Sequence, residues 1–135
     1  MNRILGIDYG SARVGISLSD PLKIIASDFE VIQNKNSKKT VDRIGEICIE
    51  NKVGIIVLGL PINMDGSLGF QAQEVLDFEE EIKRLEIKII LSDERLTTKM
   101  AEETMVEMKM SKDEIRKKSD AKAASFILQH YLDFN

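Results

Sequence analysis

Acidic side chains stand beside apolar segments at places far apart in the sequence. Asp8 ends the first apolar run, and Asp93 and Glu94 directly follow a later one. Asp120 opens a C-terminal helical pattern. An acid beside a buried core is costly to ionise unless a cation or hydrogen-bond donors compensate its charge. If these acids converge, with no histidine or cysteine nearby, they suit hard cations such as Mg²⁺ or Mn²⁺. Two such ions about 4 Å apart activate a water and stabilise the leaving oxygen of a phosphodiester, so the acids favour phosphoryl chemistry.

Each acid also has a purely structural interpretation. Asp8 precedes Gly10, and an aspartate before glycine commonly caps a turn. Asp120 fits the N-cap or first turn of a helix, where the helix dipole favours a negative charge. Spacing does not choose between Asp93 and Glu94, because adjacent strand residues point to opposite faces and a one-residue register shift exchanges them.

The N-terminal third of the chain is predicted to form strands. Residues 4–8, 14–19 and 23–33 have strand composition and are separated by glycine, serine, aspartate and proline. Connections this short join antiparallel neighbours, so the pattern predicts a three-stranded meander. A loop at 34–37 then supplies a helix cap.

Helices and buried strands are predicted to alternate from this point. A first helix has its apolar stripe at Val41, Ile44, Ile47 and Cys48, which makes Cys48 a core residue rather than a nucleophile. Residues 53–60 and 87–91 are short apolar runs that suit buried parallel strands. Between them, a second helix has a predicted core stripe at Phe70, Val75, Phe78, Ile82 and Leu85.

The C-terminal part of the chain combines a basic segment with a final helix. Thr97 or Thr98 can cap a third helix that carries Ala101, Met105 and Met108. Residues 109–118 form a cation-rich segment that we expect to be a solvated loop, followed by a helix over 119–132. Within the segment, the candidate contacts to a nucleic-acid backbone are Lys112, Arg116, Lys117 and Lys118. The alternative is a merely solvated face.

Composition bounds the fold and the setting. The 135 residues, 43% of them hydrophobic, suit one domain over 1–135 with a sizeable core. The element order predicts an α/β protein with a mixed five-stranded sheet flanked by helices. The net charge of −4 argues against a general polycation, and one cysteine without a signal-peptide pattern fits the cytoplasm. No apolar run approaches the ~20 residues that cross a bilayer, so we expect no membrane association.

Four motifs resemble those of the YqgF family, in the same order and over the whole chain. The first is Gly6-Ile7-Asp8-Tyr9-Gly10 with Arg13-Val14-Gly15 and Ser19-Asp20. The others are Leu58-Gly59-Leu60-Pro61 with Met64-Asp65-Gly66-Ser67 and Gly69, then Asp93-Glu94-Arg95-Leu96-Thr97-Thr98, then Asp120 with Ala123-Ala124 and Ile127-Leu128-Gln129.

The resemblance implies a ribonuclease H-like fold, akin to Holliday junction resolvases. It also implies a metal-dependent nuclease that processes the 5′ end of the 16S ribosomal RNA precursor. By motif matching, Asp8, Glu94 and Asp120 take the positions that bind the metal, Mg²⁺ or Mn²⁺, and serve catalysis. Asp93 is the neighbour that competes with Glu94 for this role.

Three classes of function fit these residues. A metal-dependent nuclease acting on structured RNA or branched DNA accounts for all the acids and the basic segment. An actin-like or sugar-kinase-like ATPase would share the motif at 6–10, but such proteins enclose ATP between two domains that each exceed this chain in size. A non-catalytic nucleic-acid-binding module would bind RNA in Mg²⁺ or Mn²⁺ and never cut it.

Substrate and oligomeric state are linked. The sequence fits an RNA precursor and a Holliday junction equally, because both present phosphodiesters and shape rather than a readable base sequence. A symmetric resolvase needs two sites to cut two strands and is therefore a homodimer, whereas a monomer suffices to trim an RNA end.

Overall fold

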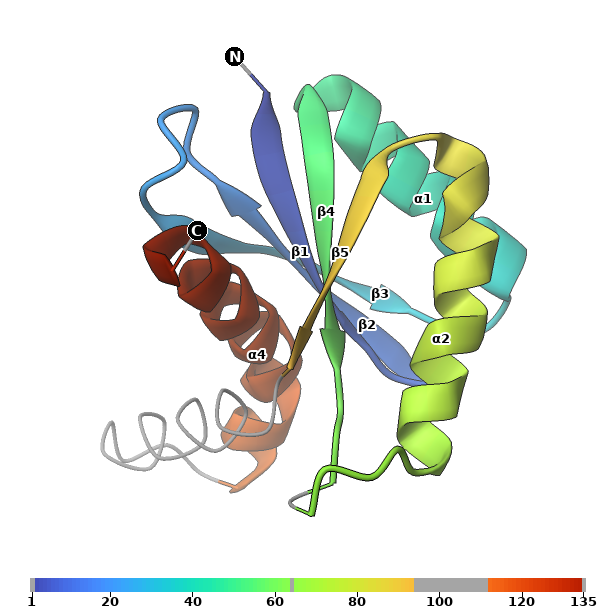
Figure 1. The fold of residues 1–135 in the computed structure, drawn as a ribbon. Helices are drawn as coiled ribbons and strands as arrows, with labels where there is room; N and C mark the ends of the chain where they lie inside the picture. The colour runs from blue at the N-terminus through green and yellow to red at the C-terminus, as the bar shows by residue number, and fades with distance from the viewer. Residues whose placement is uncertain (1, 64, 94–111, 135) are drawn as a thin grey trace.

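A five-stranded sheet forms the centre of the molecule, and its first strand lies in the middle (Figure 1). The computed structural model describes residues 2–63, 65–93 and 112–134, with the backbone alone at 112–121. The strands are β1 (Arg3–Tyr9), β2 (Arg13–Ser19), β3 (Ala26–Gln33), β4 (Val53–Leu60) and β5 (Lys88–Asp93), in the order β3-β2-β1-β4-β5. β1, β2 and β3 pair antiparallel, while β4 and β5 continue the sheet parallel to β1. The predicted mixed sheet is confirmed.

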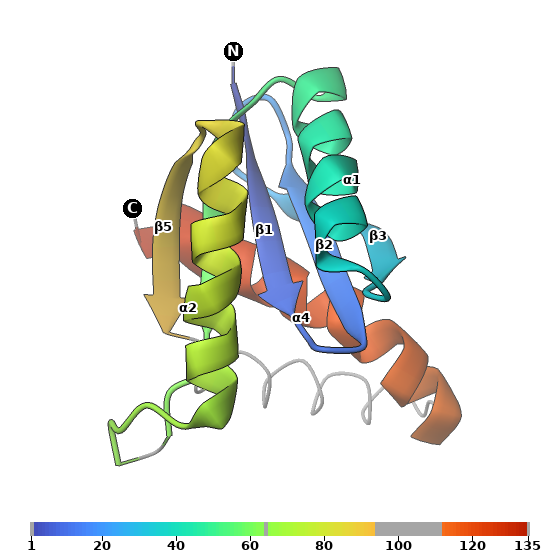
Figure 2. The same cartoon turned by 90° about the vertical axis from the view of Figure 1, so that its right-hand side faces the viewer.

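Helices cover both faces of this sheet (Figure 2). α1 (Ser37–Glu50) and α2 (Phe70–Ile82), with the 3₁₀ turn η1 (Lys83–Leu85) after it, pack on one face. α4 (Lys112–Phe134) crosses the other face. α1 begins where the sequence predicts, because the Asn36 side chain accepts a hydrogen bond from the Lys39 N–H at 3.2 Å.

Alternation along the strands divides the apolar residues into two clusters. Leu5 and Ile7 of β1 join the cluster under α1 and α2, whereas Ile4 joins the cluster under α4. Phe78 belongs to the first cluster and packs its ring on Tyr9, with ring centroids 4.3 Å apart. The side-chain faces of β1 are therefore fixed by packing on both sides of the sheet.

Cys48 lies in the core, as predicted. Its side chain is buried in the cluster under α1 and α2, and burial raises the pKa of its thiol to about 11. A thiol with so high a pKa is a poor nucleophile at neutral pH. In the part of the chain that the structure describes, no helix has the length and apolarity to span a membrane.

The third strand, β3, begins later than predicted, because the Asp20 side chain accepts hydrogen bonds from the backbone that precedes it. Asp20 accepts hydrogen bonds from the N–H groups of Leu22, Ile24 and Ile25 at 2.7–3.2 Å. These donors lower the pKa of the Asp20 carboxyl. Residues 23–25, predicted as strand, therefore form a loop around a charged carboxylate, and Asp20 has a structural role.

Phe70 corrects the prediction for the second helix. Its side chain is 81% exposed, although the helical stripe places it with the core residues Val75 and Phe78. The first turn of α2 extends past the end of the sheet, where the stripe has nothing to pack against (Figure 2).

The C-terminal helix corrects two further predictions. α4 begins at Lys112, so most of the cation-rich segment predicted as a loop is helical. Asp120 lies inside this helix and not at its start, which rules out the N-cap interpretation. The helix predicted to follow Thr97 or Thr98, with Ala101, Met105 and Met108, lies outside the described residues.

Candidate active site at the carboxyl end of the central strand

Asp8 is the first element of the candidate site. It lies near the end of β1, is half-buried, and pairs with Gly15 of β2. Ile4 packs under α4, and side chains of a strand alternate between its faces, so Asp8 shares the α4 face with Ile4 and Gly6. The carboxylate is thus presented at the carboxyl edge of the parallel strands, on the side that α4 covers, where α/β sheets place their sites.

Gly6 brings α4 onto the sheet beside Asp8. A Cβ at Gly6 would lie 2.4 Å from Ser17 Oγ and 2.8 Å from Leu128 Cβ, distances that real Cβ atoms essentially never show, and 3.0 Å from the Ala124 carbonyl oxygen. Next to it, the buried Ser17 hydroxyl donates to the Ala124 carbonyl at 2.8 Å. A glycine and a small polar residue therefore set the distance between β1, β2 and the helix that carries Asp120.

Gly6→Ala is expected to destabilise the protein by roughly 1–3 kcal/mol, because overpacking forces α4 away from β1. The measurement is thermal or urea unfolding beside the wild type. Gly54→Ala is the control, since the atoms nearest to its added Cβ, at 2.8–3.0 Å, belong to the exposed Asn2 side chain, which can move into solvent, and not to a packed helix. Equal unfolding curves for Gly6→Ala and the wild type would show that the close approach of α4 is not structurally required.

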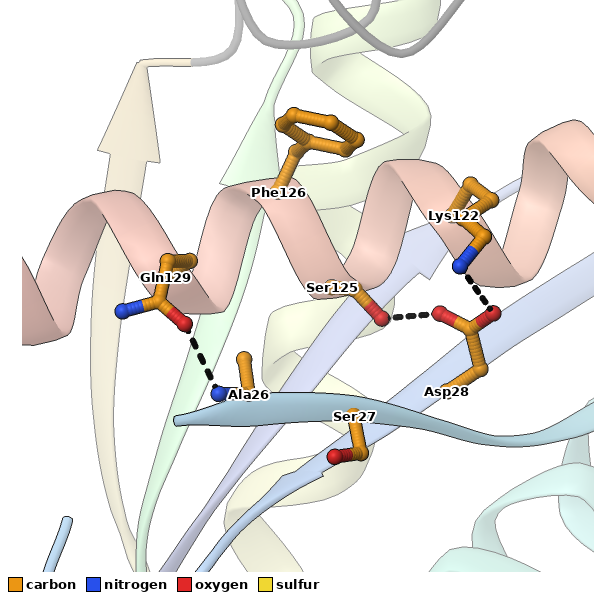
Figure 3. A pocket seen from close by; sticks show the side chains of 7 residues that line it. All are labelled: Ala26, Ser27, Asp28, Lys122, Ser125, Phe126 and Gln129. Carbon is orange, nitrogen blue, oxygen red and sulfur yellow. Dashed lines mark hydrogen bonds and ion pairs between the residues drawn. The ribbon is translucent and has the colours of Figure 1, made fainter. Parts of the chain in front are cut away.

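Side chains of α4 also attach the helix to β3 (Figure 3). Lys122 Nζ lies 3.1 Å from Asp28 Oδ2, and the Ser125 hydroxyl donates to the other oxygen of the same carboxylate. One turn later, the Gln129 side chain accepts from the Ala26 N–H at 2.8 Å. These contacts give a physical reason for the glutamine in the fourth motif.

A pocket of about 350 Å³ lies between β3 and α4, lined by these residues. Three side chains of α4 point toward β3, those of Lys122, Ser125 and Gln129, and Asp28 points from β3 toward α4 (Figure 3). The Phe126 ring points away from β3. Asp28 binds Lys122 and Ser125 within the pocket, and Gln129 binds the Ala26 N–H. These contacts hold α4 against the sheet, so we do not take this pocket as the candidate active site.

The structure describes the other predicted site residues to different extents. Asp120 lies in α4 one turn before Ala124, the residue that touches Gly6. Glu94 lies outside the described residues. The predicted nucleic-acid contacts Lys112, Arg116, Lys117 and Lys118 belong to the N-terminal turns of α4, where the backbone alone is described. Among the residues with described side chains, no three acids, histidines or cysteines form a metal-binding group.

Asp93 lies on the face opposite to Asp8. It pairs with Leu60 of β4, whose side chain packs against the cluster under α1 and α2. Partners in neighbouring strands point to the same face, so Asp93 is directed to the α1 and α2 side. The register of β5 thus separates Asp93 from Asp8.

The loop between β4 and α2 was not predicted to be part of the site, yet it adjoins it. Ile7 pairs with Leu58, so β4 continues past the level of Asp8 and the loop leaves the sheet at the same edge. Its Pro61 and Asn63 line a second pocket of about 260 Å³ together with the start of α2. The proline after an apolar run was the signal for the end of the strand, but sequence did not show which edge the loop would reach.

Residues 2–134 match the family RuvX, whose description is Holliday junction resolvase. The chain belongs to the RuvX family. Among RuvX relatives, a protein of Clostridium acetobutylicum named "Putative pre-16S rRNA nuclease" is 43% identical over 97% of this chain and 98% of its own length. A protein of the same name from Endomicrobium trichonymphae is 46% identical over 98% of this chain and 96% of its own length. RuvX and YqgF are names of the same family, so the family resemblance stated from the motifs is confirmed.

Solved structures share the RuvX fold at low sequence identity. RuvC of Thermus thermophilus, in complex with a Holliday junction substrate, superposes with a TM-score of 0.61 and 12% identity over 99% of this chain and 98% of its own. The Holliday junction resolvase of fowlpox virus gives a TM-score of 0.56 and 16% identity over 97% and 98% of the two chains. These similarities confirm the predicted ribonuclease H-like fold.

Proposed function

We propose that this protein is a metal-dependent nuclease that hydrolyses phosphodiester bonds of structured nucleic acid. The observation that carries the proposal is the position of Asp8 at the carboxyl edge of the sheet, on the face that α4 covers. Membership of the RuvX family and the names of its relatives support the same activity. We take residues 1–135 as one catalytic domain acting in the cytoplasm.

The residues that would hold the metal are Asp8, Glu94 and Asp120. Carboxylate oxygens are the donors that Mg²⁺ and Mn²⁺ prefer, and a half-buried Asp8 gains from a cation that compensates its charge. When bound, the metal supplies a nucleophilic water and stabilises charge on the leaving oxygen. The chain itself orients the acids through the β1 register and the contacts of α4 with Gly6 and Ser17.

Glu94 is preferred to Asp93 for a geometric reason. Asp93 belongs to the face of β5 that is directed toward α1 and α2, away from Asp8. Adjacent residues of an extended chain point to opposite faces, so we infer for Glu94 the face on which Asp8 lies. This argument from register supports the assignment that family resemblance suggests.

Asp120 is assigned on the register of α4. Position 120 lies four residues before Ala124, and positions four apart share one side of a helix. Leu128 shares a core cluster with Ile4 and, like Ala124 one turn before it, lies against Gly6. The next turn is that of Asp120, and the next position of β1 on this face is Asp8.

We propose the precursor of 16S ribosomal RNA as the substrate, cut at its 5′ end. Two relatives that are 43% and 46% identical over nearly their full length have the name "Putative pre-16S rRNA nuclease", and the resemblance of the motifs suggests the 5′ end. The family description favours the alternative, a resolvase acting on four-way DNA junctions. Both substrates place phosphodiesters in a defined shape rather than in a specific base sequence.

A cleavage assay with both substrates tests the proposal. The purified protein is incubated with a 16S precursor fragment and with a four-way junction, in Mg²⁺, in Mn²⁺ and in chelator. Cleavage of the RNA end in metal alone supports the proposed function, while symmetric cuts in the junction favour the resolvase. Binding of either without any cleavage would identify a non-catalytic module. The solution mass adds an independent criterion, since the resolvase requires a homodimer.

The basic N-terminal turns of α4 are expected to bind the nucleic-acid backbone. Neutralising Arg116, Lys117 and Lys118 together should weaken binding across all sequences and flatten its salt dependence by roughly one unit of slope per lost phosphate contact. Fluorescence anisotropy at several salt concentrations measures both quantities.

A matched control neutralises three cations at the opposite edge of the sheet, Lys52, Lys83 and Lys88. This variant has the same net charge as the α4 variant, and its salt slope should equal that of the wild type. Equal slopes for both variants would show that the α4 cations form only a solvated face.

A further inference from the structure

Asn34 follows directly after β3 and binds the turn that joins β1 to β2. Its side-chain amide donates a hydrogen bond to the Gly10 carbonyl at 3.0 Å, and its backbone N–H donates to the Ala12 carbonyl at 2.9 Å. Asp8 lies two residues before Gly10. One half-buried residue therefore fixes two carbonyl groups of the turn that begins where the strand of Asp8 ends.

Thr40 holds the Asn34 amide in one orientation. A carbonyl oxygen only accepts hydrogen bonds, so the amide nitrogen of Asn34 must face Gly10 and its oxygen must face the other way. The buried Thr40 hydroxyl donates to that oxygen at 2.8 Å, and it also lies 3.2 Å from the Asn36 carbonyl. Since Thr40 belongs to α1, these bonds connect the turn after Asp8 to a helix packed on the core.

The position of Asp8 depends on this hairpin. Asp8 pairs with Gly15 of β2, whereas the pairs of β1 with β4 end one residue earlier, at Ile7 and Leu58. Backbone pairing therefore holds Asp8 from the β2 side. The place of β2 at this level is in turn fixed by the turn that Asn34 binds.

The turn is too tight to absorb a shift within itself. A Cβ at Gly10 would lie 2.6 Å from the Arg13 carbonyl oxygen, so the two ends of the turn are in close contact. Only Tyr9 separates Gly10 from Asp8. A movement of the Gly10 carbonyl therefore reaches Asp8, and a metal ligand has to be held within about 0.5 Å of its working position.

We propose that Asn34, oriented by Thr40, is a positioning residue for the metal site, because it fixes the turn that determines where Asp8 presents its carboxylate. The inference rests on the proposed function, since it requires Asp8 to be a metal ligand. Asn34 acts through the backbone of the turn and has no part in the chemistry. Residues that orient metal ligands typically contribute roughly ten- to a hundredfold in metal affinity or activity. An indirect action through the backbone places Asn34 at the lower end of that range.

Binding of Mn²⁺ in the absence of nucleic acid tests the positions of the ligands without any reaction. Electron paramagnetic resonance measures free Mn²⁺ during a titration and so gives its dissociation constant. Asn34→Ala should bind Mn²⁺ roughly tenfold more weakly than the wild type. Its single-turnover cleavage rate at subsaturating Mn²⁺ should fall by a similar factor, while its affinity for nucleic acid in chelator should not change.

Asn51→Ala is the matched control. Asn51 is also a half-buried asparagine whose side-chain amide donates to a backbone carbonyl, that of Ile47, at 2.9 Å. It lies two residues before β4, at the opposite edge of the sheet from Asp8. This variant loses the same kind of hydrogen bond as Asn34→Ala, and its Mn²⁺ dissociation constant should equal that of the wild type.

A second pair of variants changes the orientation of Asn34 and leaves Asn34 itself in place. Thr40→Ser retains the hydroxyl that donates to Asn34, so its Mn²⁺ affinity should match the wild type. Thr40→Val has nearly the same shape without a donor, and it should weaken Mn²⁺ binding in the direction of Asn34→Ala. This pair decides the question even if Asn34→Ala does not fold.

The outcomes distinguish this inference from the proposed function. If Asn34→Ala and Thr40→Val melt at lower temperatures but bind Mn²⁺ as the wild type does, the role of Asn34 is merely structural and the proposal is overturned, whether or not the protein is a nuclease. Weaker Mn²⁺ binding by these two variants, together with a wild type that cleaves no substrate, would support the positioning role and reject the nuclease. A wild type that binds no Mn²⁺ would reject both.

Discussion

Asp8→Asn is expected to abolish metal-dependent cleavage while the protein stays folded. Metal binding requires the charged carboxylate, and the amide that replaces it has nearly the same size. Charge stabilisation by a metal is worth several kcal/mol, and about 1.4 kcal/mol corresponds to a factor of ten, so the rate should fall at least roughly a hundredfold. The measurement is the single-turnover cleavage rate in Mg²⁺ and Mn²⁺, with circular dichroism to confirm folding.

Three further variants sharpen this test. Glu94→Gln and Asp120→Asn should lose activity to the same extent, because both are proposed ligands. Asp93→Asn is the matched control, since Asp93 is directed to the opposite face of the sheet, and it should retain cleavage. Full activity in Asp8→Asn would contradict the metal mechanism, and loss of activity in Asp93→Asn with a fully active Glu94→Gln would assign the ligand role to Asp93 in place of Glu94.

The second large effect is on stability, and its sign should depend on metal. Without metal, carboxylates gathered at one edge of the sheet repel one another and lose hydration, so Asp8→Asn should melt at the wild-type temperature or above it. A cation that binds only the folded state contributes about 2.7 kcal/mol at a hundred times its dissociation constant. For a chain of this size that is roughly 10 °C in melting temperature, and the variant should lose most of the gain.

Melting curves in chelator and in Mg²⁺ or Mn²⁺ measure both signs. Asp93→Asn again serves as the control and should gain from metal as the wild type does. If the wild type and Asp8→Asn gain equally, Asp8 is not a ligand, and its interpretation as a turn-capping residue regains support.

Much of the fold was predictable because most helices and strands that pack on the core have a regular pattern of apolar residues in the sequence. β4 has the predicted bounds, and α1 is capped by Asn36, a residue of the loop at 34–37 that was predicted to supply the cap. Both have continuous or periodic apolar residues that core burial requires. The prediction of Asp8 as a site residue rests on a related reason, since a carboxylate at the end of a buried strand needs a compensating partner.

The errors share a different physical origin. The start of α2 and the N-terminal turns of α4 extend past the sheet (Figure 2). A helix without a core beneath it needs no apolar stripe, and a stripe that continues there stays exposed, as Phe70 shows. The periodicity of apolar residues therefore gave two wrong predictions. It predicted a loop at 112–118, which is helical, and it predicted burial of Phe70, which is exposed. The late start of β3 had a third cause, the Asp20 carboxylate and its three backbone donors.

The sequence by itself identified the candidate acidic residues, the order of the helices and strands, and the family, because these depend on residue types and on spacing along the chain. Only the tertiary structure decided which face of the sheet Asp8 and Asp93 each occupy. Alternation along a strand has a period of two, and its phase is set by what packs on either side. α4 packs on Gly6, and Leu60 packs under α1 and α2, so Asp8 and Asp93 lie on opposite faces. That phase depends on contacts between residues more than a hundred positions apart, such as Ser17 with Ala124, which no local pattern contains.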